Sequence, residues 1–365
     1  MKQLSHKAIV LLQSLIATPS FSKEEFATAD IIAAFLENEK IKTHRKKNNI
    51  WAFNKTFNSS LPTLLLNSHH DTVKPGNDWT KKPFDPIISE EKLFGLGSND
   101  AGGALVSLLA TFLHFNEKEI PFNLIFAASA EEEISGKAGI ESILSELGKI
   151  DAAIIGEPTQ MNLAIAEKGL LVLDCISIGK TGHAAREEGE NAIYKAMKDI
   201  VWFQTFKFSK ISKWLGEIKM SVTVIEGGKQ HNVIPEKCSF TVDIRVTDEY
   251  ALEEILEIVK QNVDCEVTPR SVRLKSSFIS ENHPLVISGK NIGRNLYGSP
   301  TLSDQALIPF PSIKIGPGNS ARSHTADEFI FIEEIEEGIK LYIELLENYQ
   351  KEILTSTQKL EIGNH

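Results

Sequence analysis

The stretch LLLNSHHDTV, residues 64–73, changes within a few positions from consecutive leucines to polar residues that can bind a metal. Three leucines in a row are typical of a strand buried on both faces. Side chains two apart on a strand share a face, so His69 and Asp71 point the same way while His70 points away. A carboxylate beside an imidazole fixes its tautomer and raises its basicity. The stretch predicts a buried strand ending in a metal-ligating histidine, although a polar turn alone also fits it.

The composition is that of a globular protein with two domains. The chain has 365 residues, which is long for one core, and 42% of them are hydrophobic. A formal net charge of −10 argues against a nucleic-acid or anionic-membrane partner. No stretch approaches the roughly 20 apolar residues of a membrane span. Three widely spaced cysteines, Cys175, Cys238 and Cys265, indicate buried thiols, so we expect a cytoplasmic protein.

Apolar strands alternate with helices in the first part of the chain, which predicts an α/β fold with a layered sheet. The N-terminal residues predict a first helix and not a signal peptide, because polar residues interrupt the apolar patch at helical spacing. The expected helices cover residues 5–16, 23–39, 101–115 and 139–147. The expected strands cover residues 50–54, 62–68, 122–128 and 152–156.

The pattern changes after about residue 166. Residues 167–279 read as strand, helix, strand, strand, helix and strand, the βαββαβ order of a ferredoxin-like domain. Strands such as SFTVDIRV alternate polar and apolar residues, so one face of this second sheet should be covered by helices. We therefore expect a discontinuous catalytic domain of residues 1–166 plus 280–351, an inserted domain of residues 167–279, and a loose tail at 352–365.

Residues able to bind a metal follow several predicted strands or turns. Asp100 closes GLGSND before a helix, where it could simply be an N-cap. The run AEEEISG puts three carboxylates beside an apolar strand, where they repel one another unless a cation compensates them; a surface turn is the alternative. Binding sites of open α/β sheets lie at the carboxyl ends of the strands. The candidate ligands are His69, Asp100, Glu133, Glu157 in GEPT, and His324 in GPGNSARSH.

Two imidazoles and three carboxylates without a thiol suit zinc, cobalt or manganese. Five ligands are too many for one tetrahedral catalytic ion. They suit two ions about 3.5–4 Å apart that share a bridging carboxylate and a bridging water. Glu132, next to a ligand but spare, is the candidate general base.

These motifs, in this order over nearly the whole chain, resemble those of the dinuclear-zinc amidohydrolase and exopeptidase family. That family includes acetylornithine deacetylase, succinyl-diaminopimelate desuccinylase, aminoacylase and carboxypeptidase G. The resemblance implies a mixed-sheet, zinc-exopeptidase-like catalytic domain with an inserted lid and dimerisation domain. The sequence departs from the family pattern at Ser68, at Glu131 and in DAGGA, which lacks a family lysine. None of these positions is a ligand.

The resemblance also implies a role for each candidate ligand. His69 and Glu157 would bind one zinc ion and Glu133 and His324 the other, and cobalt could replace zinc. Asp100 would bridge the two ions and would precede a cis peptide bond to Ala101.

Further roles follow from the same resemblance. Glu132 would take a proton from the attacking water and later protonate the departing amine. Asp71 would orient His69, and His183 of a partner subunit would stabilise the oxyanion. Asn232, Arg245 and Gly316 would contact the substrate. The plainer interpretations are a solvated loop histidine for His183, a turn residue for Asn232 and a solvated strand charge for Arg245.

The function expected from the resemblance is metal-dependent hydrolysis of an N-acyl amino acid, with water as co-substrate. Within the family we expect an acetylornithine deacetylase of arginine biosynthesis, a homodimer through the inserted domain. N-acetyl- or N-succinyl-citrulline, succinyl-diaminopimelate and acetyl-lysine remain open as substrates. Two other functions also remain open: a metallo-dipeptidase or carboxypeptidase, and a non-catalytic, metal-stabilised binding protein. The spare base Glu132 argues against the last.

Overall fold

The computed structural model describes residues 1–362 and divides into two compact units. The larger unit contains Met1–Ile165, Phe278–Tyr297 and the chain from Ser303 onward. The smaller unit contains Ala166–Ser277 and Gly298–Leu302. No helix among the described residues combines the length and apolar character needed to cross a bilayer.

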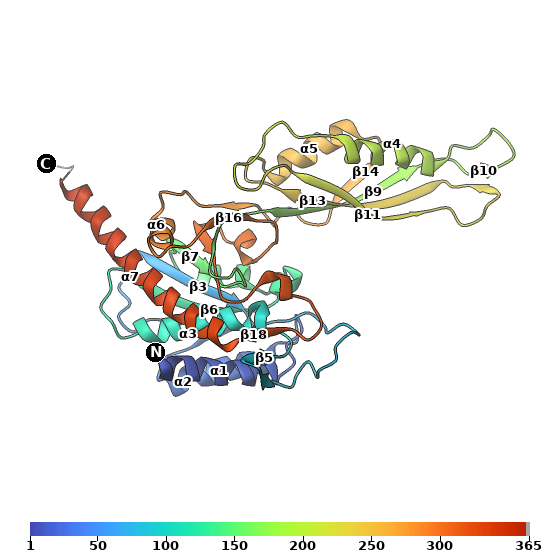
Figure 1. The fold of residues 1–365 in the computed structure, drawn as a ribbon. Coiled ribbons are helices and arrows are strands. Elements are labelled where there is room, and N and C mark those ends of the chain that lie inside the picture. The colour runs from blue at the N-terminus through green and yellow to red at the C-terminus, as the bar shows by residue number, and fades with distance from the viewer. Residues whose placement is uncertain (363–365) are drawn as a thin grey trace. The chain divides into compact units, whose positions relative to one another are not determined.

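Among the described residues, a nine-stranded mixed sheet forms the centre of the larger unit (Figure 1). Its order is β1-β2-β6-β3-β7-β17-β8-β15, and β16 pairs with β8. The central strands β6, β3, β7 and β17 are parallel, while β2 and β8 flank them in the antiparallel direction. All residues of these four parallel strands are buried, as expected for strands covered on both faces. The strands are β1 (His44–Lys46), β2 (Asn49–Phe53), β3 (Thr63–His69), β6 (Asn123–Ser129), β7 (Ala152–Ile155), β8 (Leu163–Glu167), β15 (Ser277–Phe278), β16 (Leu296–Ser299) and β17 (Ser312–Lys314).

Helices cover this sheet. The apolar helix α3 packs on β3 and β6 and is itself covered by α1 and α7 (Figure 1). Because it is enclosed by other elements, almost all of its residues are buried. The helices of this unit are α1 (Lys2–Ile16), α2 (Phe26–Asn38), α3 (Gly103–Phe115), α6 (Pro284–Asn291) and α7 (Ile332–Ile362).

Two expectations about helices are wrong. Residues 139–147 form two short 3₁₀ turns, η3 (Ile140–Ser142) and η4 (Leu144–Glu146), and not one helix. Ile140 and Ile143 share a face in a 3₁₀ turn, so they still pack in a core with Leu65. The expected loose tail is helical to Ile362 as part of α7, because neither Gly nor Pro occurs between residues 339 and 362. Residues 363–365 of the expected tail lie outside the described residues.

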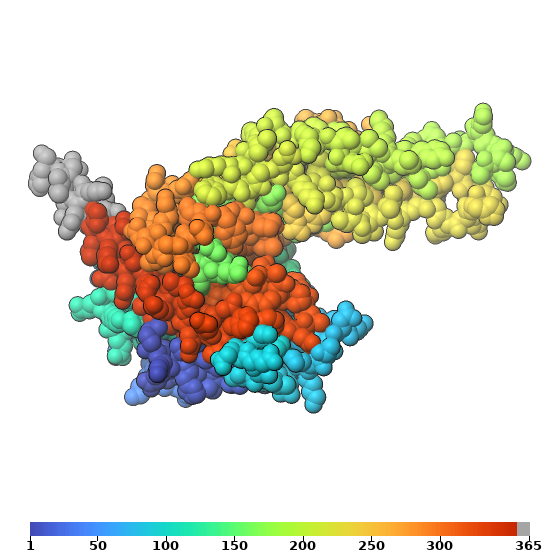
Figure 2. Space-filling view, viewed as in Figure 1, coloured from blue at the N-terminus to red at the C-terminus, as the bar shows by residue number. Residues whose placement is uncertain are grey.

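A small sheet of three strands joins distant parts of the chain within the larger unit. Its order is β18-β5-β4, where β4 is Ile88–Ser89, β5 is Lys92–Phe94 and β18 is Phe329–Phe331. Figure 2 shows the red-orange chain before α7 lying directly against the cyan chain of β4 and β5. This pairing brings the loop that carries His324 close to the turn that carries Asp100.

The smaller unit has a four-stranded antiparallel sheet in the order β11-β13-β9-β14. Apart from the short pair β10 (Gly182–His183) and β12 (Val233–Ile234), its elements follow the βαββαβ order expected from the sequence. Alternate residues of β9 and β13 are buried, and they pack with helix residues in one core. The elements are β9 (Gly169–Ile178), α4 (Ala192–Thr205), β11 (Lys219–Gly227), β13 (Lys237–Val246), α5 (Leu252–Asn262) and β14 (Glu266–Pro269).

Candidate metal centre

The candidate ligands gather at the carboxyl ends of neighbouring parallel strands. His69 is the last residue of β3, and Glu157 lies two residues beyond β7. Glu132 and Glu133 begin the 3₁₀ turn η2 (Glu132–Ile134), which follows β6. Since β6, β3 and β7 lie side by side, these side chains meet above one edge of the sheet.

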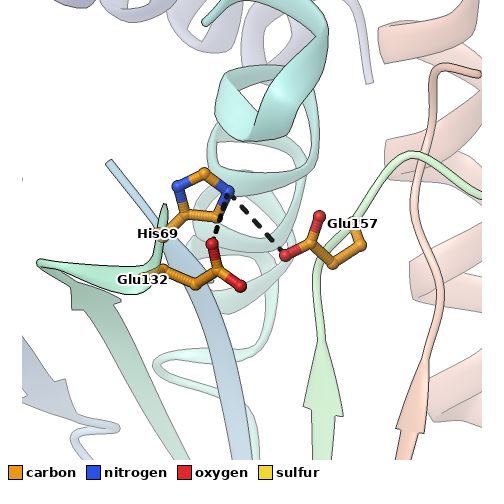
Figure 3. Close-up of side chains that lie close together, drawn as sticks. All are labelled: His69, Glu132 and Glu157. Carbon is orange, nitrogen blue, oxygen red and sulfur yellow. Dashed lines mark ion pairs between the residues drawn. The ribbon is translucent and has the colours of Figure 1, made fainter. Parts of the chain in front are cut away.

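His69 lies at the middle of the cluster, and its side chain is almost fully buried. Figure 3 shows its Nε2 atom facing the carboxylates of Glu132 and Glu157. The distances from Nε2 are 3.7 Å to Glu157 Oε1 and 4.0 Å to Glu132 Oε2. The Nδ1 atom lies 3.0 Å from the backbone carbonyl oxygen of Asp71. A proton on Nδ1 would bond this carbonyl and leave Nε2 free to bind a cation.

Asp100 lies between the two histidines. Its Oδ1 atom is 3.3 Å from His69 Nε2, and its Oδ2 atom is 3.6 Å from His324 Nε2. His324 also lies 2.9 Å from Glu133 Oε2. The expected cis peptide bond between Asp100 and Ala101 is present. One carboxylate oxygen thus faces each histidine, the arrangement that a bridging ligand requires.

Asp71 does more than the sequence suggested. Its carboxylate accepts hydrogen bonds from the backbone N–H groups of Glu132 and Glu133, at 3.0 and 3.2 Å, and from the Ser22 hydroxyl at 2.7 Å. Its Oδ1 is 3.5 Å from His69 Nδ1, farther than its own carbonyl oxygen. Asp71 therefore holds the turn of Glu132 and Glu133 as well as facing His69.

Burial and mutual repulsion change the pKa values of these groups. Burial and the charges of nearby carboxylates raise the pKa of Glu157 to about 8 and that of Glu132 well above its ordinary value. Burial opposes a charge on His69, yet Glu132, Asp100 and the other carboxylates outweigh it and raise the pKa of the imidazole. The main cause that raises the pKa of His324 to about 9 is the hydrogen bond that its ring N–H donates to the Glu133 carboxylate.

This donor set fits two divalent cations. Two groups of side chains offer ligand atoms that all lie within 4.8 Å of one another: His69, Glu132 and Glu157, and His69, Asp100 and Glu133. Oxygen and imidazole nitrogen are the donors preferred by zinc, manganese and cobalt in catalytic sites. Carboxylates with such raised pKa values would release their protons when a cation binds, because the cation's charge offsets the repulsion between the carboxylates.

The other predicted residues lie elsewhere or have other contacts. His183 and Asn232 are neighbours in the smaller unit, where the Ala184 N–H donates to the Asn232 carbonyl oxygen. Arg245, on β13, makes a two-point ion pair with Asp243 at 2.9 and 3.1 Å. Gly316 lies in the larger unit, and a Cβ there would come within 2.5 Å of the Glu157 carbonyl oxygen. The closest neighbour of Gly316 is thus the backbone of Glu157, a candidate metal ligand. The roles expected for His183, Asn232, Arg245 and Gly316 remain predictions.

Two buried carboxylates of the site were not foreseen. Asp304 accepts hydrogen bonds from Asn67 Nδ2 and Ser129 Oγ at 2.8 and 2.6 Å, and burial raises its pKa to about 6. Glu328 accepts hydrogen bonds from backbone N–H groups around Asp100, and burial raises its pKa to about 8. Asp304 begins the short 3₁₀ turn η5 (Asp304–Leu307) and Glu328 directly precedes β18, so no periodicity marks either residue. The SHTADE context places Glu328 near His324, and that proximity is the one signal the sequence offered.

His70 points away from the ligands, as the alternation along β3 predicts. Its ring lies 2.9 Å from Thr28 Oγ1 and 2.9 Å from the Asn48 carbonyl oxygen. Burial lowers the pKa of His70 to about 4, so it is a neutral, hydrogen-bonded core residue.

Comparison with known proteins supports the resemblance found in the motifs. The sequence profile of peptidase family M20/M25/M40 matches residues 65–348. A succinyl-diaminopimelate desuccinylase of Wolbachia pipientis wMel is 26% identical over 373 residues, which cover 93% of each chain. An acetylornithine deacetylase of Buchnera aphidicola subsp. Schizaphis graminum is 28% identical over 336 residues, covering 86% of this chain and 87% of that protein.

Solved structures show the same fold. A tripeptidase from Staphylococcus aureus subsp. aureus Mu50 gives a TM-score of 0.76 at 20% identity, covering 95% of this chain and 99% of that one. A dinuclear metal-binding peptidase of the M20 family from Bacillus subtilis gives a TM-score of 0.73 at 17% identity, covering 94% and 98%. Both likenesses extend over the whole mixed α/β architecture.

Proposed function

Because this chain belongs to peptidase family M20/M25/M40, and so is a metal-dependent hydrolase of amide bonds, we propose that it deacylates an N-acyl amino acid. The observation that carries the proposal is the position of Asp100, with one carboxylate oxygen toward His69 and the other toward His324. Such a centre suits hydrolysis of a small linear amide with water as second substrate.

We assign the cations to two sites that share Asp100. His69 and Glu157 hold one, and Glu133 and His324 hold the other. Two bound cations would lower the pKa of a shared water and polarise the substrate carbonyl. Zinc fits this donor set, and cobalt is the alternative metal.

Glu132 is the general base of the proposed reaction. Its carboxylate lies 4.0 Å from His69 Nε2, and burial together with neighbouring negative charges raises its pKa. A base with a raised pKa can accept a proton from the attacking water and then donate it to the departing amine. Asp71 keeps Glu132 in place through the backbone N–H of that residue.

The proposed substrate is N-acetylornithine, in the biosynthesis of arginine. The acetylornithine deacetylases among the relatives support it, with the Buchnera enzyme 28% identical to this chain. Succinyl-diaminopimelate is the second candidate, because desuccinylases are similar at 26% identity over a longer alignment. Acylated citrulline, acetyl-lysine and short peptides are further candidates, the peptides because several structures of the same fold are peptidases.

We further propose that the protein is a cytoplasmic homodimer that pairs through its smaller unit. Large apolar side chains are exposed on α4, where Tyr194, Met197 and Val201 are 72%, 53% and 53% accessible. Val224 and Ile225 are similarly exposed on β11, which packs beside α4. Apolar side chains gathered on adjacent elements are typical of a protein interface. His183 would reach the partner's site from this unit.

A substrate panel tests the function. Metal-free protein is loaded with zinc or cobalt and assayed for amine release from acetylornithine, succinyl-diaminopimelate, acylated citrulline, acetyl-lysine and a set of dipeptides. We expect acetylornithine to give the highest kcat/KM. Turnover confined to peptides would overturn the deacylase proposal in favour of a peptidase. Absence of turnover with every compound, despite bound cations, would support the non-catalytic alternative.

A further inference from the structure

A buried glutamate outside the ligand set holds the backbone of the bridging aspartate. Glu328 is 1% exposed. Its Oε1 atom accepts hydrogen bonds from the N–H groups of Asn99 and Asp100, at 2.8 and 2.9 Å. Its Oε2 atom accepts one from the Gly97 N–H at 3.0 Å. Both oxygens of one carboxylate are thus committed to a single turn.

This turn is not held by regular helical hydrogen bonds throughout. It is the short irregular element η1 (Ser98–Gly102), in which Asp100 and Ala101 have non-helical backbone angles. Backbone N–H groups in such a turn have no regular helical partners and must be satisfied in another way. Glu328 satisfies three of them at once, from a position 228 residues farther along the chain than Asp100.

The same segment also carries the histidine on the other side of Asp100. Glu328 follows His324 by four residues, and His324 Nε2 faces Asp100 Oδ2 at 3.6 Å. A second link runs parallel to the first: the Asn319 N–H donates to Asn99 Oδ1 at 2.9 Å, and Asn99 Nδ2 donates to the Asn319 carbonyl oxygen at 3.1 Å. Glu328 therefore ties the bridging carboxylate to the loop that supplies a ligand of one metal site.

We propose that Glu328 is a positioning residue that sets the place of the Asp100 carboxylate between the two cations. This inference rests on the proposed metal sites. Asp100 is shared, so a small displacement of its backbone alters the geometry of both sites. Residues that orient metal ligands typically change metal affinity or activity by about 10–100-fold when substituted. Glu328 would thus act on cation binding without touching a cation.

The test is zinc binding to the metal-free full chain, measured by competition with a chromophoric chelator. Glu328→Gln keeps the size of the side chain but replaces one accepting oxygen with an NH₂ group, which cannot accept the Gly97 N–H. We expect its zinc affinity to fall about 10–100-fold, the range for residues that orient ligands. Glu333→Gln is the matched control, because it removes the same charge from an exposed position nearby in the sequence. It should bind zinc as the unsubstituted protein does.

A second variant separates position from charge. Glu328→Asp keeps the negative charge but is one methylene shorter, so it cannot reach all three N–H groups. If Glu328 positions Asp100, Glu328→Asp should also bind zinc more weakly, and its cobalt-loaded form should show an altered visible absorption spectrum. Unchanged zinc affinity in either folded variant would overturn the inference. Failure of both variants to fold would also overturn it, since Glu328 would then serve the fold. If the unsubstituted protein binds fewer than two zinc ions, the proposed function itself fails.

Discussion

Glu132 and Glu133 are adjacent in the sequence, yet their carboxylates face different histidines. Glu133 Oε2 lies 2.9 Å from His324 Nε2, whereas Glu132 Oε2 lies 4.0 Å from His69 Nε2. The tight turn η2 separates them, because successive residues of a 3₁₀ turn point about 120° apart. The difference in contact supports the proposal that Glu133 binds a cation and that Glu132 transfers a proton.

Glu132→Gln tests this division of roles. We expect turnover to fall by about 10²–10⁴-fold, the usual contribution of a general base, while both cations stay bound. Glu133→Gln is the comparison, since it should lose one cation as well as activity. Turnover and metal content, the latter by atomic absorption, are measured on each variant. If Glu132→Gln loses a cation and Glu133→Gln does not, the two roles are exchanged.

Asp71 contacts both His69, a proposed metal ligand, and Glu132, the proposed base, so its loss should affect both. Asp71→Ala removes the acceptor of the Glu132 and Glu133 N–H groups and the carboxylate beside His69. We expect cation affinity to fall about 10–100-fold, as for other groups that orient ligands.

Ser22→Ala is the control for Asp71, because it removes one hydroxyl partner of the same carboxylate. It should cost about 1 kcal/mol of stability, the net value of one hydrogen bond, with cation affinity nearly unchanged. Calorimetric metal titration and urea unfolding measure the two effects. Equal losses of affinity in both variants would contradict a special role for Asp71.

At the residue scale, the sequence was informative where side-chain direction follows a period. The alternation along β3 separated His69 from His70, and the structure agrees: His70 bonds Thr28 and Asn48. It gave no signal for Asp304, and for Glu328 it gave only the position close to His324. These residues act through backbone N–H groups or through polar side chains brought in from distant strands, and such contacts depend on the tertiary fold.

At the scale of elements, the order of the strands decides which loops meet. The apolar runs in the sequence predicted three of the four buried parallel strands, β3, β6 and β7, but not the three-residue β17. The rule that sites lie at the carboxyl ends of such strands then indicated where the site lies. Boundaries were harder to predict. Helix α2 begins at Phe26 and not at residue 23, since Lys23 has a left-handed φ of 77°. The apolar spacing of residues 140–143 fits an α-helix and a 3₁₀ turn equally well.

Gly316 shows how packing at the end of a strand affects a ligand. A Cβ at this position would lie 2.5 Å from the Glu157 carbonyl oxygen and 2.9 Å from Ala104 Cβ. Gly316→Ala should therefore displace the chain that carries Glu157, weakening cation binding and destabilising the protein. Gly76→Ala is the control, because a Cβ there meets no atom within 4 Å. The Tm of each variant, measured with and without zinc, distinguishes Gly316→Ala from Gly76→Ala. Full zinc stabilisation of Gly316→Ala would contradict this account.

At the scale of the whole molecule, each unit has its own core and its own exposed surface. The proposed dimer depends on the apolar side chains of α4 and β11, so a charge placed there should prevent pairing. Met197→Glu combined with Val224→Glu should convert a dimer to a monomer. Val10→Glu is the control, since Val10 is 47% exposed on α1 of the larger unit. Light scattering after size exclusion gives the masses. A monomeric unsubstituted protein, or a variant that still dimerises, would refute this interface.

The two cores also predict how the protein unfolds. One core is built on residues of β9 and β13 and the other on β3, β6 and β7, so each unit can unfold cooperatively by itself. All the candidate metal ligands belong to the larger unit. A ligand at 1,000 times its Kd stabilises the state that binds it by about 4 kcal/mol. Bound zinc should therefore raise the Tm of the larger unit and leave that of the smaller unit nearly unchanged.

Calorimetry with and without a chelator measures this difference, and tryptophan fluorescence assigns the transitions. The chain has four tryptophans, with Trp51 and Trp79 in the larger unit and Trp202 and Trp214 in the smaller. The variant Trp51→Phe/Trp79→Phe thus reports on the smaller unit, and Trp202→Phe/Trp214→Phe reports on the larger. We expect the chelator to lower the fluorescence Tm only in the second variant. Equal shifts in both variants would mean that the two units unfold together, since zinc could then stabilise the smaller unit only through the larger one.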